Sequence, residues 1–205
     1  MDEFKTIEKE VESELIEKKS KFIASIFKVN SVKEADEKLL EVKKRYYDAK
    51  HNCYTYRVIE NDRIIEKSSD DGEPSGTAGA PMLNILKQNN LCNVLIVVTR
   101  YFGGILLGTG GLVRAYSRST QDVIEKSNIV LKESGYKINI EIEYKELEKL
   151  KYFCKKNEIK ITNIQYLENV IVTIELRKDK EQLIRKSDNL NFEYLKYNII
   201  EEKFI

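Results

Sequence analysis

The sequence predicts an α+β protein of two domains, residues 1–134 and 135–205. Three observations lead to this class. Strand-like and helical patterns of apolar residues alternate along the whole chain. Eight of the nine glycines and both prolines fall between positions 72 and 111, where the backbone must therefore turn or approach another group closely. The ninth glycine, Gly135, precedes a segment with the βαββαβ order of a ferredoxin-like unit.

The first domain is expected to begin with strands and a capped helix. Apolar and polar residues alternate before position 30, and Ser31 with Glu34 has the spacing of a capping box ahead of apolar residues at helical intervals. These patterns predict a hairpin turning at residues 18–21, a helix over residues 32–47, and strands over residues 52–59 and 63–67 joined by a turn at Asn61 and Asp62.

The glycine-rich window is expected to hold two helix starts around one buried strand. Pro81 suits the first position of a helix, because its missing N–H is not needed there. Residues 94–98 are an unbroken aliphatic run, which indicates a strand covered on both faces. The second glycine group follows this strand directly, and a helix over residues 112–126 follows the glycines.

The second domain alternates strand and helix patterns after Gly135, which we interpret as the domain boundary. The expected elements are a strand over residues 136–144, a helix over 146–157, strands over 159–167 and 170–176, a short helix over 180–187 and a strand over 197–204.

Composition favours a soluble cytoplasmic protein. The chain has 35 basic and 34 acidic side chains, a net charge of +1, so it lacks the basic excess of a dedicated nucleic-acid binder. No basic-then-apolar leader and no apolar run long enough for a bilayer are present, so no membrane partner is expected. Cys53, Cys92 and Cys154 fit neither a disulfide framework nor a zinc ligand set, and we interpret them as buried thiols.

A strand, a glycine-rich loop and a helix start together form the usual cradle for a phosphate group. The second glycine group has this layout, but Thr109 and Gly110 stand where a P-loop needs lysine and Ser/Thr, and Val113 stands where a dinucleotide fingerprint needs its third glycine. Neither standard nucleotide motif is therefore present.

The two glycine groups could still converge on one anionic ligand, with acids that either bind metal or pair with arginine. The alternative is that the loops only pack against each other and the acids are solvated turn residues. The candidate ligand-binding residues are His51, Asp70, Asp71, Glu73, Ser75, Gly76, Thr77, Arg100, Gly103, Gly104, Gly108, Thr109, Gly110 and Arg114.

Catalysis has little support in the sequence, and no catalytic residue, metal site or cofactor is assigned. His51 is the only histidine, so a histidine-based triad has one base and no evident partner. Cys53 could be an activated thiol or part of a plain strand face. A metal held by Asp70, Asp71 and Glu73 alone would have oxygen ligands only, which favours magnesium, but adjacent acids in a turn are weak support.

Nucleic acid would need a local basic patch. The candidates are residues 43–45, residues 18–21, and a third group on and after the first helix of the second domain, although solvated helix faces explain all three at least as well. The third strand of that domain, residues 169–176, lacks the aromatics of an RNA-recognition motif. The patch residues that we consider are Lys149, Lys151, Lys155 and Lys156.

Three segments resemble the signature of the IMPACT family in its bacterial, YigZ-like form: residues 70–79, residues 98–104 and residues 107–116, reading DDGEPSGTAG, VTRYFGG and LGTGGLVRAY. The resemblance is strong over about residues 15–128 and rests on pattern alone beyond them. It implies a first domain like the second domain of ribosomal protein S-five, and a ferredoxin-like second domain resembling C-terminal domains of elongation factor G.

The resemblance implies less about function. Eukaryotic members look like regulators of translation under amino-acid starvation that act by protein binding, while bacterial members are poorly assigned. We therefore expect a non-enzymatic, translation-associated protein that contacts a ribosome, RNA or a translation factor, an expectation that rests on fold analogy. The alternative is an enzyme or sensor that binds a phosphorylated small molecule at the two glycine loops.

Overall fold

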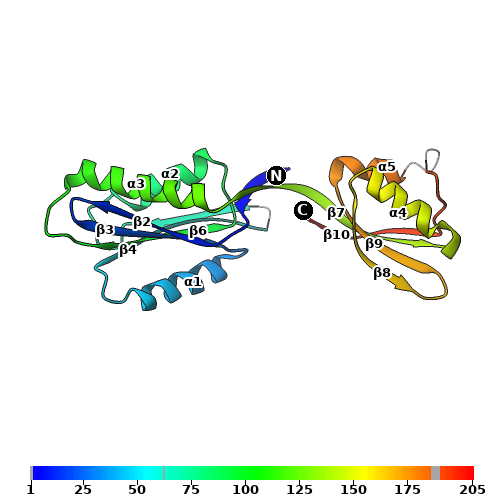
Figure 1. Ribbon diagram of the computed structural model, residues 1–205, viewed down its shortest axis with the longest axis horizontal. Helices are drawn as coiled ribbons and strands as arrows, with labels where there is room; N and C mark the ends of the chain where they lie inside the picture. The colour runs from blue at the N-terminus through cyan, green and yellow to red at the C-terminus, as the bar shows by residue number, and fades with distance from the viewer. Residues whose placement is uncertain (1, 62, 186–189) are drawn as a thin grey trace. The chain divides into compact units, whose positions relative to one another are not determined.

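The computed structural model describes residues 2–61, 63–185 and 190–205, which form two compact units (Figure 1). One unit is Phe4–Leu131, and the other is Lys132–Ile205 with the start of the chain as far as Glu3. The division falls inside strand β7 (Ile129–Ile142), which also contains Gly135. Both units combine helices with sheets of antiparallel strand pairs, which confirms the mixed α and β class.

A five-stranded antiparallel sheet forms the middle layer of the first unit. Two of its three inner strands, residues 51–60 and 94–101, are almost wholly buried, as the aliphatic run at residues 94–98 predicts for the second of them. The strands lie in the order β2 (Val11–Glu17), β3 (Ser20–Lys28), β6 (Val94–Tyr101), β4 (His51–Glu60) and β5 (Arg63–Ser69).

Helices cover both faces of this sheet (Figure 1). Helix α1 (Val32–Arg45) packs on one face, against alternate side chains such as Tyr56 and Val97. Helices α2 (Gly79–Gln88) and α3 (Gly108–Lys126) pack on the other face, against the intervening side chains of the same strands. The unit therefore has three layers, with one apolar core on each side of the sheet.

The capping box predicted for α1 is present with one change. The Ser31 hydroxyl accepts a hydrogen bond from the Glu34 N–H (3.0 Å), while the Glu34 carboxylate accepts from the N–H of Asn30 (2.7 Å). The helix begins as expected and ends at Arg45, two residues before the predicted end.

Helices α2 and α3 begin earlier than the sequence predicts. Pro81 is the third residue of α2, which starts at Gly79. Helix α3 includes the second glycine group from Gly108 onward, although we expected a loop before residue 112. Glycine has a low helix propensity, which hides this first turn in the sequence. Leu107 and Leu112 pack on the core at either end of the turn and hold it.

The second unit has the predicted βαββαβ order. The 180–187 helix is present as α5, but residues 186 and 187 lie outside the described residues, as does Asp62 of the predicted 61–62 turn. After β7 the elements are η1 (Tyr144–Glu146), α4 (Leu147–Lys156), β8 (Lys160–Tyr166), β9 (Val170–Arg177), η2 (Lys178–Lys180), α5 (Glu181–Arg185) and β10 (Lys196–Phe204).

In the sheet of this unit, β7 lies between β9 and β10, and β8 lies on the far side of β9. The start of the chain is fastened here by the Ser134 N–H, which donates to the carbonyl oxygen of Asp2 (2.7 Å). The chain then passes through β1 (Glu3–Ile7) into the first unit, where Lys5 pairs with Leu91.

Gly135 occupies a position where no side chain fits, because a Cβ there would lie 2.6 Å from the Leu176 carbonyl oxygen on β9. We expect Gly135→Ala to lower the free energy of unfolding by about 1–3 kcal/mol, since backbone must move to relieve the overlap. Urea unfolding followed by circular dichroism measures the change. Ser134→Ala is the control, and equal effects of the two substitutions would contradict the close packing.

Candidate functional site

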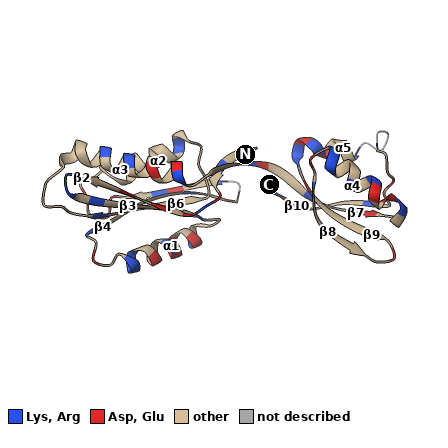
Figure 2. Cartoon of the chain, in the orientation of Figure 1, with Lys and Arg blue, Asp and Glu red and all other residues tan. Residues whose placement is uncertain are grey.

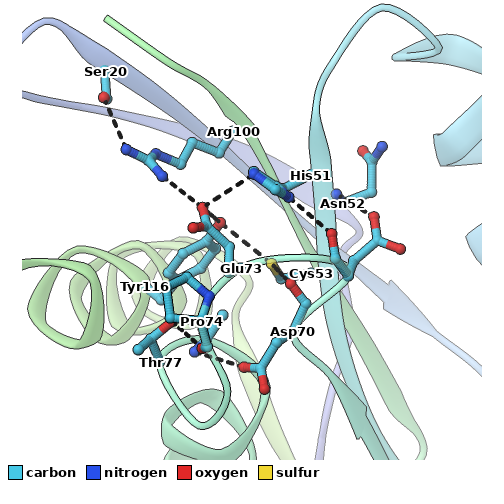
Figure 3. Close-up of polar contacts among 12 residues, drawn as sticks. Ser20, His51, Asn52, Cys53, Asp70, Glu73, Pro74, Thr77, Arg100 and Tyr116 are labelled. Atoms are coloured by element: carbon cyan, nitrogen blue, oxygen red, sulfur yellow. Dashed lines mark hydrogen bonds and ion pairs between the residues drawn. The ribbon is translucent and has the colours of Figure 1, made fainter. Parts of the chain in front are cut away.

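The first glycine loop, residues 70–78, is held in place by the Asp70 carboxylate, which caps the N-terminus of α2 (Figure 3). The Asp70 carboxylate accepts hydrogen bonds from the backbone N–H groups of Gly76 (2.8 Å), Ala78 (2.9 Å) and Gly79 (2.9 Å). Burial opposes ionisation of this carboxyl, but the three N–H donors outweigh it and hold the pKa of Asp70 below its ordinary value. The chain itself therefore supplies the anion at this helix end.

A buried ion pair joins this loop to the sheet and to α3. Glu73 Oε1 accepts hydrogen bonds from Arg100 Nη1 on β6 (2.7 Å) and from the Tyr116 hydroxyl on α3 (2.9 Å). The Glu73 and Arg100 side chains are only 3% and 7% exposed. A buried charge is tolerated when it is paired and hydrogen-bonded, so each side chain depends on the other. Arg100 is thus engaged within the protein.

His51, at the start of β4, faces the same carboxylate. Its Nδ1 lies 2.8 Å from the Asp71 carbonyl oxygen, and because a carbonyl only accepts, Nδ1 is the donor and carries a proton. Its Nε2 lies 4.0 Å from Glu73 Oε1. The Asp71 carboxylate points elsewhere, accepting from the Asn52 N–H (2.7 Å) and from Lys43 of α1 (2.8 Å).

The Cys53 thiol is a buried member of the network. It donates toward the Asp70 carbonyl oxygen (3.0 Å) and lies 3.3 Å from the Tyr116 hydroxyl. Burial raises the pKa of Cys53 to about 12, so the group is a protonated thiol at neutral pH. Of the two interpretations from sequence, the geometry favours the strand face over the activated thiol.

The second glycine loop, which connects β6 to α3, packs on the hairpin between β2 and β3. A Cβ on Gly103 would lie 2.0 Å from the Lys19 carbonyl carbon, so only glycine fits. The Gly103 N–H donates to the Ser20 hydroxyl (3.2 Å), which Arg100 Nη2 also approaches (3.4 Å). One arginine thus contacts both glycine loops, through Glu73 on the first and through Ser20 beside the second.

The two loops face each other across a cavity of about 400 Å³. It combines apolar walls with the start of α3, where the N-cap residue is Leu107 and no side chain among the described residues caps the helix. Several predicted residues meet here, and the lining includes His51, Glu73, Arg100, Phe102, Leu106 and Thr109.

Several other ligand-binding candidates predicted in the loops do not line this cavity. Thr77 donates to the Pro74 carbonyl oxygen (2.7 Å) within the loop, and Arg114 lines a separate hollow on α3. Gly76 and Gly104 adopt positive φ, at +76° and +81°, as turn positions. Neither Ser75 nor Gly110 lines the cavity.

The acids of the first loop have separate partners. Asp70 contacts backbone N–H groups, Asp71 contacts Lys43 and Glu73 contacts Arg100. Over the described ranges, 2–61, 63–185 and 190–205, no group of three or more His, Cys, Asp or Glu side chains is placed to hold a metal ion.

The lysines proposed as a patch on α4 are partly neutralised. Lys149 pairs with Glu146 of η1 (3.0 Å) and Lys151 with Glu148 of the same helix (2.8 Å), so an acid offsets each of these two lysines (Figure 2). Lys155 and Lys156 lie in its last turn and are exposed. Among the helices that the structure describes, none is long and apolar enough to cross a membrane.

Comparison with known proteins agrees with this architecture. Residues 18–124 match the Impact N-terminal domain and residues 140–186 match a domain of unknown function, DUF1949. The IMPACT family member YvyE of Bacillus subtilis (strain 168) is 40% identical over 165 residues, 80% of this chain and 76% of its own. The IMPACT family member YigZ of Escherichia coli (strain K12) is 34% identical over 160 residues, 78% of each chain.

A crystal structure of a protein described only as hypothetical superposes with a TM-score of 0.64 and 30% identity, over 99% of this chain and all of the other. The fold and the site define a two-unit α+β protein with a buried polar network behind a glycine-lined cavity. The chain belongs to the IMPACT family.

We expect Glu73→Gln to lower the free energy of unfolding by about 3–5 kcal/mol, because it leaves the buried Arg100 guanidinium without its counter-charge. Urea unfolding at neutral pH measures this loss. The control is Glu37→Gln, which removes an exposed carboxylate 3.8 Å from Lys33 and should change stability by less than about 0.5 kcal/mol. A Glu73→Gln effect as small as the control's would contradict the dependence on the pair.

We expect Asp70→Ala to lower stability by about 0.5–2 kcal/mol at neutral pH, as for other helix caps. Because the folded pKa of Asp70 is lowered, its contribution is complete above the unfolded value of about 4 and is lost as the pH falls through the folded pKa. The difference in unfolding free energy between wild type and variant should therefore shrink on acidification. A difference that does not change with pH would show that the Asp70 charge is not what caps α2.

The three cysteines should react slowly in the folded protein. Burial raises the pKa of both Cys53 and Cys154 to about 12 and also raises that of Cys92, so little thiolate exists at neutral pH. Titration with a chromogenic disulfide reagent should detect all three thiols in denaturant and almost none without it. Rapid reaction of one thiol in the native protein would restore the activated-cysteine interpretation.

Proposed function

We propose that this protein is a non-enzymatic, translation-associated binding protein whose partner is the ribosome, RNA or a translation factor. Membership of the IMPACT family supports the link to translation, since eukaryotic members resemble translation regulators. We also propose that its two units are related to the second domain of ribosomal protein S-five and to C-terminal domains of elongation factor G. Such a role would place the protein in the cytoplasm.

The observation that carries a binding role is the mutual engagement of the polar groups at the glycine loops. Arg100 is paired with Glu73, the start of α2 is capped by Asp70, and the Cys53 thiol has a raised pKa. These interactions fix the shape of the loops and leave their charged groups committed to the fold. A rigid surface of fixed shape suits recognition of a macromolecule with little rearrangement.

Co-sedimentation with purified ribosomes at low and moderate salt tests the proposal. We expect the protein to pellet with ribosomes, less so at moderate salt, because contacts to RNA phosphates release counterions. A ribosome-free sample controls for aggregation. Protein that stays in the supernatant at both salt concentrations would contradict a ribosomal partner.

The cavity between the loops favours a second candidate function, the binding of a phosphorylated small molecule. Its volume of about 400 Å³ lies within the range of ligand pockets, and His51 and Lys50 line it near the uncapped start of α3. An anionic ligand should raise the melting temperature, and Lys50→Gln should reduce the shift. Lys50 is exposed, whereas substituting Arg100 would also break the ion pair with Glu73. No shift with any phosphorylated metabolite would contradict this function.

A further inference from the structure

A second hollow, distinct from the cavity between the loops, lies where α3 passes the turn between β2 and β3. It has a volume of about 200 Å³. Three basic side chains line it: Lys18 from the turn, and Arg114 and Arg118 from α3. Basic residues are visible along α3 in Figure 2. In the sequence, Lys18 belongs to the basic residues 18–21 and Arg114 to the candidate ligand-binding residues, and no local pattern brings the two together.

The backbone positions of these three residues are well defined by the fold. Lys18 and Lys19 both have positive φ, at 45° and 66°, as in the tight two-residue turns that join antiparallel strands. Gly103 packs against the Lys19 carbonyl and holds the turn in place. Arg114 and Arg118 are four residues apart and therefore share one face of α3.

Arg114 also lies over the first turn of its own helix. Its Nη1 is 3.5 Å from the point where a Cβ of Gly110 would stand. The guanidinium therefore lies beside the first turn of α3. The positive end of the helix dipole and the arginine charge therefore act on the same side of the molecule.

The charges of this hollow are largely uncompensated. Among the described residues, neither Lys18 nor Arg114 takes part in an ion pair, and Arg118 lies at the limit of one, 4.0 Å from Asp122. In the part of the chain that the structure describes, Glu17 is the only acid in the lining. On α4, by contrast, the two lysines nearest the start of the helix are each paired with a glutamate.

A nucleotide-sized ligand needs a pocket of about 300 Å³ or more, so this hollow suits a single phosphate group of a longer chain. Arginine binds phosphate through paired N–H donors, and exposed cations gain affinity for RNA by contacting several phosphates together. We propose that Lys18, Arg114 and Arg118 bind the phosphate backbone of RNA. This inference rests on the proposed translation-associated function and specifies its contact surface.

Two triple variants with the same change in charge test the inference. Lys18→Gln, Arg114→Gln and Arg118→Gln remove the cations of the hollow, while Lys151→Gln, Lys155→Gln and Lys156→Gln remove those of α4. Binding to fluorescent oligouridylate is measured by anisotropy over a range of salt concentrations, and binding to ribosomes by sedimentation. Thermal unfolding should be nearly the same for both variants and wild type, because five of the six cations are exposed and Lys151 is half-buried with only a surface ion pair to Glu148.

We expect the first variant to bind oligouridylate more weakly than wild type. The slope of log affinity against log salt concentration should become less steep by about 2, because each of three lost phosphate contacts contributes roughly 0.7 to it. The α4 variant should keep a slope close to that of wild type. The inference is overturned if the first variant binds as wild type does, or if the α4 variant loses as much. Displacement of the RNA by oligoglutamate of equal charge would also overturn it, in favour of an acidic protein partner.

The same experiments separate this inference from the proposed function. If wild type and the first variant pellet equally with ribosomes, the hollow is not the contact surface and the translation-associated function stands. If wild type binds neither ribosomes nor oligouridylate, both the contact surface and the RNA or ribosome partner fail.

Discussion

The buried pair between Glu73 and Arg100 is the interaction on which the arrangement of the first unit depends. Arg100 belongs to a central strand, Glu73 to the first glycine loop and Tyr116 to α3, and all three meet at one carboxylate oxygen. Burying two charges is costly unless their geometry and additional hydrogen bonds compensate. We therefore expect the loops to keep their positions only while this carboxylate and this guanidinium stay together.

The pair also determines which charged groups remain available to contact a binding partner. Arg100 and the start of α2 were among the candidates for anion binding in the sequence, but Glu73 and Asp70 already supply the negative charge at each. The proposed phosphate contacts therefore fall on other groups, at the start of α3 and on the cations Lys18, Arg114 and Arg118.

Much of the fold follows from local patterns in the sequence. The Ser31 and Glu34 box starts α1, and the run from Val94 marks a strand buried on both faces. Contacts between distant residues were harder to predict. The early start of α2 depends on Asp70, and the early start of α3 depends on core leucines. The residues near Gly108 carry no local sequence signal for the start of a helix. The convergence of Lys18 with Arg114 requires a hairpin and a helix nearly a hundred residues apart in the chain to pack together.

A double-mutant cycle on Glu73→Gln and Arg100→Met, followed by urea unfolding, tests the central claim most directly. If each side chain is costly mainly because the other needs it, the double variant should be less destabilised than the sum of the single variants, by about 1–3 kcal/mol. Losses that simply add, with a coupling free energy near zero, would show that the loops are held by something other than this pair.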